Sequence, residues 1–465
     1  MSFSHPFHFL LELIPFFLGW ILGFNCLSFW LQVFVINHPN EFYNALLDKC
    51  KSSKKRIALA SLYLGTGPLE TKLVETLDSR LGQINGLKVN ILLDANRGSR
   101  GKLNSRRMLL PLLQNYPQCQ VSLFHTPTLR GPLRYLLPAR YNELVGLQHM
   151  KLYLFDDTVI ISGANLSEDY FTNRQDRYLV VSDCKDLADF YWGLIERVSG
   201  VSLALDASNN LTPRSHHPYK TSKRDYVLKA KEKIWGYYKA YLDRNVNFNN
   251  NKENHDTWIF PLVELPPLGV HQESKVTAKI IRSFPAGSEL TLSTGYFNIT
   301  QQYSDTLLYK SLAKCKILMA HPTANGFLKA GGLASGIPEA YTGLAHRFLL
   351  GVLGSGQAGR VTMHEWSRPR WTYHAKGLWA TPPLHRYPLL TLIGSSNFGA
   401  RSVWRDLETG IAVVTANSQL QKQLYSEEKA LTNDTSPFTL DVVSQPQRKP
   451  PLWVLTTMWL FKTFF

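Results

Sequence analysis

Two short segments of the chain repeat one pattern of reactive residues. The first is QHMKLYLFD, in which His149 lies two residues before Lys151, and the second is YHAKGLWA, in which His374 lies two residues before Lys376. Side chains two residues apart on a β-strand point to the same face, so each pair would place an imidazole beside a fixed cation. An imidazole can act as a nucleophile or as an acid–base group, and a cation can stabilise a developing oxyanion. The pattern predicts substitution at a phosphodiester.

An asparagine and an acid follow each pair. Asn165 and Asn397 come shortly after a glycine that ends a β-rich run, and Asp176 and Glu408 each lie eleven residues after their asparagine. Matched offsets of this kind indicate an internal repeat, in which two halves each supply part of one site. We expect the asparagines to hold phosphate oxygens. We expect each acid to accept a hydrogen bond from the outer ring nitrogen of a histidine and to fix its tautomer.

The two copies resemble the paired motifs of the phospholipase D superfamily. The first copy, with SGANLSEDYFTNRQDRY after it, resembles the phosphatidylglycerophosphate synthase branch in particular, and further similar stretches run from about residue 55 to about residue 435. The superfamily pattern places an aspartate five residues after each lysine. Here Asp156 fills that place in the first copy and Thr381 in the second. We include Asp156 in the catalytic set, with a mainly structural and orienting role.

The resemblance implies an activity and a role for each histidine. His149 would attack the phosphatidyl phosphorus of CDP-diacylglycerol, and His374 would protonate the departing CMP. The primary hydroxyl of sn-glycerol 3-phosphate would then take the phosphatidyl group, which gives phosphatidylglycerophosphate, the precursor of phosphatidylglycerol and cardiolipin. Because the repeat is nearly symmetric, the two histidines could exchange roles. No cofactor or metal is required on this interpretation, while stimulation by a divalent cation and assembly into a homo-oligomer stay open. The expected location is the mitochondrial inner membrane.

Three alternatives share the same motifs. A phosphatidyltransferase with serine as acceptor would differ only in its acceptor pocket, and an arginine-rich pocket favours a phosphorylated acceptor. A nucleic-acid phosphodiesterase would suit the net charge of +16, although the apolar termini argue against nucleic acid as the partner. A membrane scaffold without activity would not need the intact paired motifs.

The charge predicts an anionic partner, such as a phosphate-bearing substrate or an anionic membrane surface. Four arginines in loops before the first motif are candidates for binding substrate phosphates or lipid headgroups, namely Arg97, Arg100, Arg130 and Arg134. Asn325, in HPTANGF after a predicted strand, is a further candidate, with stabilisation of a turn as the alternative. The five cysteines are scattered along the chain and argue against a disulfide framework.

Composition divides the chain into five segments. We predict a hydrophobic membrane-associating segment (1–40), a first half (41–205, motif 148–181), a polar connector with a basic helix (206–257), a second half (258–440, motif 373–414) and a basic, aromatic, membrane-interfacial tail (441–465). The uncharged run 16–36 is long enough to span a bilayer as a helix, or it could lie on the surface. The predicted fold is α/β, with two pseudo-symmetric halves. Each half would contain a mixed, mainly parallel sheet flanked by helices, and the active site would lie between the halves.

Overall fold

The computed structural model describes residues 24–25, 32–136, 139–246, 256–328, 331, 335–454 and 456. The first half contains, in chain order, β2 (Gln32–Ile36), α2 (Pro39–Ser52), β3 (Arg56–Ala60), α3 (Pro68–Gln83), β4 (Lys88–Asp94), α4 (Ala95–Gly98), α5 (Ser105–Asn115), β5 (Cys119–Phe124), α6 (Leu133–Leu136), α7 (Ala139–Asn142), β6 (Leu152–Phe155), β7 (Thr158–Ser162), α8 (Glu168–Thr172), β8 (Arg174–Gln175), β9 (Tyr178–Ser182), α9 (Lys185–Ser199), β10 (Leu203–Leu205), β11 (Leu211–Pro213) and α10 (Lys223–Val246).

The second half is built from β1 (Phe24–Asn25), β12 (Thr257–Leu265), β13 (Val270–His271), α11 (Glu273–Ser283), β14 (Glu289–Thr294), α12 (Gln301–Asp305), β15 (Lys314–Ala320), α13 (Ile337–Gly354), β16 (Val361–Trp366), β17 (Thr372–Tyr373), β18 (Gly377–Thr381), β19 (Leu390–Gly394), α14 (Ala400–Trp404), β20 (Glu408–Thr415), α15 (Ser418–Asn433), β21 (Thr435–Pro437) and α16 (Leu440–Ser444). Short helices of other kinds are η2 (Pro266–Leu268), η3 (Thr306–Lys310), η4 (Pro322–Ala324) and η6 (Pro446–Arg448).

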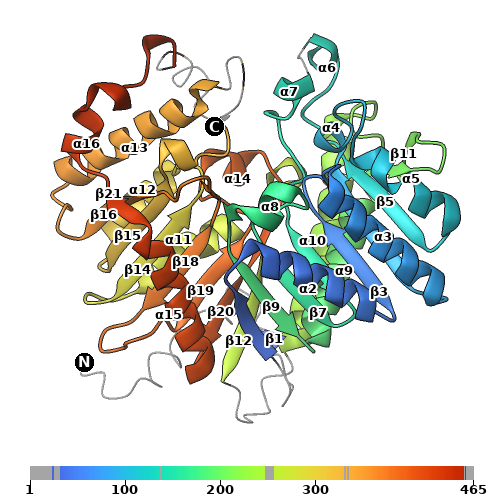
Figure 1. The fold of residues 1–465 in the computed structure, drawn as a ribbon, viewed down its shortest axis with the longest axis horizontal. Coiled ribbons are helices and arrows are strands. Elements are labelled where there is room, and N and C mark those ends of the chain that lie inside the picture. Colours follow the sequence, from blue (N-terminus) through green and yellow to red (C-terminus); the bar gives the residue numbers. More distant parts are fainter. Residues whose placement is uncertain are drawn as a thin grey trace.

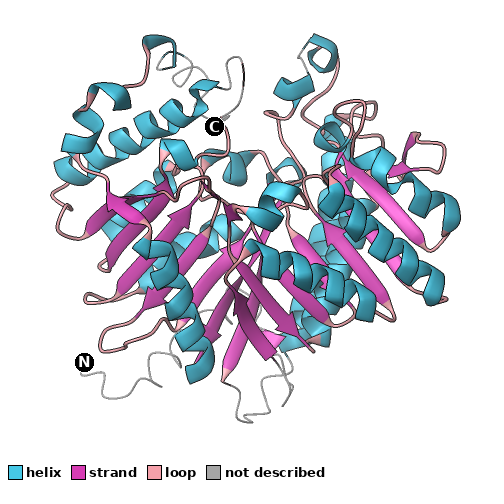
Figure 2. Ribbon diagram, viewed as in Figure 1, coloured by secondary structure: helices cyan, strands magenta, loops and turns pink. Residues whose placement is uncertain are grey.

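The two halves repeat one sheet. The strand order β5-β4-β3-β6-β7-β9 of the first sheet matches the order β16-β15-β14-β18-β19-β20 of the second. Helices cover both sheets, and the two sheets lie side by side in one view (Figures 1 and 2). The predicted α/β fold with two pseudo-symmetric halves is therefore confirmed.

The expectation that each sheet is mainly parallel needs correction. In each half only three neighbouring strands are parallel, β3-β4-β5 in the first and β14-β15-β16 in the second, and the remaining pairs are antiparallel. Helical crossovers join the parallel strands, whereas a tight turn joins β6 to β7 and forces them to run in opposite directions.

The apolar segment near the N-terminus does not form one continuous helix over residues 16–36. Within its described part, β1 pairs with β12 of the second sheet and β2 pairs with β9 of the first. The sequence of β2, QVFVI, is rich in β-branched and aromatic residues that suit a strand. Residues 1–23 and 26–31 lie outside the described part. Among the described residues, no helix is both long enough and apolar enough to cross a membrane.

The connector and the cysteines are placed as follows. The predicted basic helix of the connector is α10, which packs on α9 through aromatic contacts such as Phe190 with Tyr238.

Three cysteines, Cys50, Cys119 and Cys315, are free and buried, whereas Cys184 is disulfide-bonded. One disulfide-bonded cysteine among the four described ones is not the framework that the sequence argues against, although the sequence did not single out Cys184.

A hydrophobic core joins the two halves. It includes Leu187 and Leu194 of α9 from the first half and Ile411 and Leu424 from the second. Separate cores fill each half behind its sheet. Because the shared core lies between the sheets, the two motifs meet at a fixed interface.

Candidate active site

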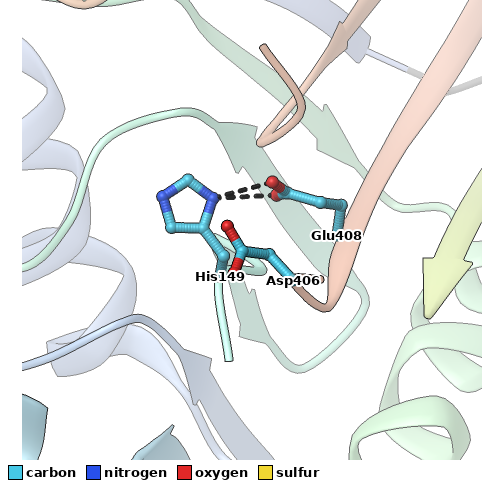
Figure 3. A group of neighbouring side chains, drawn as sticks. All are labelled: His149, Asp406 and Glu408. Atoms are coloured by element: carbon cyan, nitrogen blue, oxygen red, sulfur yellow. Dashed lines mark hydrogen bonds and ion pairs between the residues drawn. The ribbon is translucent and has the colours of Figure 1, made fainter. Parts of the chain in front are cut away.

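The backbone places each histidine beside the other half's acid. The amide of His149 donates to the carbonyl of Leu407 at 2.9 Å, and the amide of Leu407 donates to the carbonyl of Leu147 at 2.8 Å. Glu408 follows Leu407 directly, and its two carboxylate oxygens both lie 2.9 Å from Nδ1 of His149 (Figure 3). The hydroxyl of Ser402 donates to the same carboxylate at 2.8 Å. The first-half histidine is therefore oriented by a second-half acid.

The same arrangement orients His374, but here the histidine belongs to the second half and the acid to the first. β8 and β17 pair in parallel, and the amide of His374 donates to the carbonyl of Gln175 at 2.8 Å. Asp176, the next residue, lies with Oδ2 at 2.6 Å from Nδ1 of His374. Gly163 lets this carboxylate approach, because a Cβ on Gly163 would lie 2.7 Å from one of its oxygens. The predicted histidine–acid contacts are present, and each of them crosses between the halves.

The two lysines of the site differ in their hydrogen bonds. Lys151 is fully buried, and among the described residues its Nζ has no hydrogen-bond partner. Lys376 Nζ lies 2.8 and 3.1 Å from the ring nitrogens of His374 and donates to the carbonyl of that residue at 2.7 Å. Burial lowers the pKa of both lysines, that of Lys376 to about 8. A buried cation without a partner is costly, so Lys151 is suited to bind an anionic oxygen.

Burial also sets the protonation of the histidines and acids. It lowers the pKa of His149 and His374 well below the usual value, and Lys151 and Lys376 respectively lower them further. The pKa of Glu408 is raised by burial to about 7. Of the two imidazoles, His149 is the more accessible, with 13% of its side chain exposed against 3% for His374. An accessible neutral imidazole is suited to act as a nucleophile.

The asparagines differ between the halves. Asn165 is already engaged, because its Nδ2 donates to the hydroxyl of Tyr170 at 3.0 Å and its Oδ1 accepts from the amide of Leu62 at 3.3 Å. The Tyr170 hydroxyl in turn lies 3.4 Å from Nε2 of His374. Asn397 has a buried Oδ1 with no partner in the described part of the chain. Because Oδ1 is an acceptor, only the Nδ2 group of Asn397 could donate to a phosphate oxygen, whereas Asn165 is in a supporting position through Tyr170.

Asp156 does not reach the site. It lies in the turn between β6 and β7 with a left-handed backbone (φ 51°), at the far end of β6 from His149. Its carboxylate accepts the backbone amides of Lys54, Lys55 and Arg56 at 2.7–3.0 Å. The catalytic role that we expected for Asp156 is not supported, whereas its structural role is clear. Thr381 ends β18 at the matching place.

Arg97 and Arg100 lie near one another in the first half. The guanidinium of Arg97 stacks over the ring of Tyr63 at 3.8 Å, and Arg100 forms an ion pair with Glu143 at 2.7 Å. Arg401 donates to the carbonyl of Glu143 at 3.0 Å, which links this group to the second half.

The other predicted substrate contacts have structural partners. Arg130 donates to the carbonyls of Tyr219 and Thr221, and Arg134 stacks over the ring of Tyr219 at 3.7 Å. Asn325 accepts the amide of Phe327 at 2.9 Å, which is the turn-stabilising alternative. These contacts of the three residues are with other parts of the fold and not with His149 or His374.

Two ion pairs at the site were not predicted. Arg174 pairs with Asp169 at 2.9 Å, and Arg401 pairs with Asp406 at 3.1 Å. The repeat contained the signal, since Asp169 and Arg401 each lie four residues after the asparagine of their motif, and Arg174 and Asp406 each lie nine after it. The charges are reversed between the halves, so a search for identical residues would not find them.

One group near His149 has the composition of a metal site. Ligand atoms of His149, Asp406 and Glu408 lie within 4.8 Å of one another (Figure 3). Asp406, however, already accepts from the Leu147 amide at 3.0 Å and from two guanidinium nitrogens of Arg401 at 3.1 and 3.2 Å. A divalent ion would have to displace Arg401, so these residues fit a metal ion poorly.

Comparison with known proteins identifies the family. The chain is 43% identical to the mitochondrial CDP-diacylglycerol–glycerol-3-phosphate 3-phosphatidyltransferase of Homo sapiens, over 93% of this chain and 83% of that protein. It is 34% identical to the Saccharomyces cerevisiae protein of the same enzyme name, over 90% of this chain and 85% of that protein. The crystal structure of phosphatidylserine synthase from Haemophilus influenzae Rd KW20 has the same fold, with a TM-score of 0.70 and 20% identity over 98% of each chain. No protein-family profile matches the chain. On the extent of its identity to these relatives, the chain belongs to the CDP-diacylglycerol–glycerol-3-phosphate 3-phosphatidyltransferase family.

Proposed function

We propose that this protein transfers the phosphatidyl group of CDP-diacylglycerol to sn-glycerol 3-phosphate through a covalent intermediate on His149. The observation that carries this proposal is the pair of histidines, His149 partly exposed and His374 buried, each held by an acid from the opposite half, beside two buried lysines. Family membership supports the choice of donor and acceptor, because the relatives' names contain both substrates.

In the first step, Nε2 of His149 attacks the phosphatidyl phosphorus. A P–N bond forms, the P–O bond to CMP breaks, and the leaving oxygen takes a proton from His374. Glu408 accepts the Nδ1–H of His149 and stabilises the cationic ring. Lys151 and Lys376 stabilise the charge on the phosphorus oxygens in the transition state.

In the second step, glycerol 3-phosphate occupies the side that CMP has left. His374, now neutral, removes the proton from the primary hydroxyl, whose oxygen attacks the phosphorus and displaces His149. Asp176 stabilises the imidazolium of His374 and so supports both the acid and the base role. The products are phosphatidylglycerophosphate and the restored enzyme.

The test is an acceptor comparison on purified protein. CMP release from CDP-diacylglycerol should depend on glycerol 3-phosphate and should be lost in His149→Ala. A matched control is His216→Ala. His216 is a partly exposed histidine of the connector, and its Nε2 lies 2.9 Å from Nζ of Lys229. Release that depends on serine, or cleavage of a nucleic-acid phosphodiester in place of CDP-diacylglycerol, would contradict the assignment.

We further propose that the chemistry needs no metal cofactor, because Lys151, Lys376 and Asn397 are available for the phosphate oxygens. A divalent ion could raise the rate only by screening substrate charge. Activity after treatment with a chelator should therefore stay within about 3-fold of the untreated value. Complete loss, with restoration by one metal at stoichiometric amounts, would contradict this proposal.

We propose association with the mitochondrial inner membrane through exposed apolar side chains of both halves. Figure 1 shows α6 and α7 at the top right, in the first half, and α16 at the upper left, in the second half. Tyr135 of α6 is 83% exposed, and Leu452 and Trp453 near the C-terminus are 82% and 44% exposed. Exposed aromatic and apolar side chains of this kind suit a lipid interface. The double variant Tyr135→Ser/Trp453→Ser should bind vesicles rich in phosphatidylglycerol more weakly than wild type, and unchanged flotation would contradict this docking face.

A further inference from the structure

The two reversed ion pairs make the active site electrically asymmetric. Near His149, Arg401 is balanced by Asp406, whose side chain is only 3% exposed. Near His374, Arg174 is 12% exposed, and its acidic partner Asp169 is 63% exposed. Solvent screens the charge of an exposed carboxylate far more than that of a buried one. The His374 side therefore retains the larger uncompensated positive charge.

We propose that Arg174, between Tyr170 and Tyr296, binds the phosphate of the phosphorylated acceptor. This inference rests on the proposed function and names the residue that selects the acceptor. It assigns recognition of the dianion to the side where His374 activates the acceptor hydroxyl.

Arg174 is held in a fixed position for this role. It lies in β8, two residues before Asp176, and its Nε donates to the hydroxyl of Thr372 in the neighbouring β17 at 3.0 Å. Its guanidinium centre lies 4.5 Å from the centroid of the Tyr170 ring. A guanidinium fixed in this way can meet phosphate oxygens with two parallel N–H groups at little entropic cost.

The walls of the subsite also contact His374. The rings of Tyr170 and Tyr296 meet the His374 ring edge-on, with centroids 5.1 and 5.4 Å away. Gly326 approaches from the 321–327 loop, and a Cβ on it would lie 2.9 Å from the Tyr296 hydroxyl and 3.4 Å from Arg174 Nη2. Acceptor phosphate and acceptor hydroxyl would therefore occupy neighbouring positions beside His374.

The charge arrangement also agrees with the roles of the histidines. During the second step the lipid stays bonded to His149, and the acceptor arrives on the other side. Arg174 is one of the charges that lower the pKa of His374, after burial and Lys376. Once His374 has given its proton to CMP, this charge favours the neutral imidazole, which can then accept the proton of the hydroxyl.

The experiment compares steady-state kinetics of Arg174→Gln and Arg174→Lys with wild type. Loss of a charged hydrogen bond predicts a rise of about 10- to 100-fold in KM for glycerol 3-phosphate in Arg174→Gln, with kcat reduced less than about 3-fold. Arg174→Lys keeps the charge but not the two parallel N–H groups, so its KM should lie between those values. Arg197→Gln is the matched control, because Arg197 also stacks over a tyrosine, at 4.1 Å, but on the surface of α9.

Three results would overturn the inference. A fall in kcat with unchanged KM for glycerol 3-phosphate would mean that Arg174 acts through His374. A rise in KM for CDP-diacylglycerol alone would assign Arg174 to the departing CMP. Unchanged kinetics in both variants would remove it from the site altogether. Failure of the proposed function is separate, since wild type would then transfer nothing to glycerol 3-phosphate.

Discussion

Asp176→Asn removes the carboxylate that lies 2.6 Å from Nδ1 of His374 and keeps the size of the side chain. We expect slower proton transfer to the departing CMP, because a neutral amide does not stabilise the imidazolium form of His374. The contact crosses between the halves. The variant should therefore behave like His374→Ala and unlike His149→Ala, although Asp176 belongs to the motif that contains His149.

The expected loss of kcat follows from the hydrogen bond between Asp176 and His374. A hydrogen bond to a charged group contributes about 1.5–3 kcal/mol. Since about 1.4 kcal/mol corresponds to a factor of ten, kcat with CDP-diacylglycerol should fall about 10- to 150-fold. Asp157→Asn is the matched control, because Asp157 pairs with Arg56 at 2.9 Å in the turn that follows β6, and its kcat should stay within about 2-fold of wild type.

A phosphatidyl donor whose leaving group needs no protonation distinguishes loss of the general acid from loss of the nucleophile. With phosphatidyl-p-nitrophenol, Asp176→Asn and His374→Ala should recover most of the burst of p-nitrophenolate, because general acid catalysis is no longer needed. Glu408→Gln and His149→Ala should remain impaired, since they affect the nucleophile. Recovery by Glu408→Gln, or equal loss by Asp176→Asn with both donors, would refute the crossed pairing.

Three further predictions concern stability and pH. Arg177→Met should lower the free energy of unfolding by about 3–5 kcal/mol in chemical denaturation, because the buried carboxylate of Glu427, now 2.8 Å from Arg177, loses its cationic partner and keeps only the neutral indole N–H of Trp379; a loss below about 1 kcal/mol would contradict this. Asp156→Ala should cost about 1–3 kcal/mol by the same measurement through its lost backbone hydrogen bonds, while a kcat reduced more than about 3-fold would return Asp156 to the catalytic set. The pH–rate profile should be bell-shaped, since protonation of Asp176 (pKa about 6) removes the acceptor on the acid side and deprotonation of Lys376 (pKa about 8) removes a cation on the basic side; a flat profile from pH 5 to about 9 would contradict it.

The sequence was sufficient for the repeat and for most of the site. Chemistry requires fixed offsets for the His-x-Lys pairs, the asparagines and the acids. These residues can therefore be recognised without a structure. The sequence did not show which of the two histidines each acid contacts. Pairing of β8 with β17 and of the segment before His149 with that before Glu408 is a tertiary contact, and local spacing carries no information about it.

Other features depended on context in the same way. The segment before Pro39 has the hydrophobicity of a membrane helix, but at β2 an available sheet edge decides its conformation. Arg174 and Arg401 were not singled out, because a single charged residue in a sequence is usually on the surface. Only burial and the reversed pairing with Asp169 and Asp406 distinguish them.

The central claim is a covalent phosphatidyl intermediate on His149, and isotope exchange tests it most directly. Purified enzyme is incubated with CDP-diacylglycerol and labelled CMP, without any acceptor. The proposed mechanism predicts that label enters CDP-diacylglycerol in wild type and in His216→Ala, and that His149→Ala shows no exchange. Exchange that requires glycerol 3-phosphate, or that survives in His149→Ala, would contradict the account.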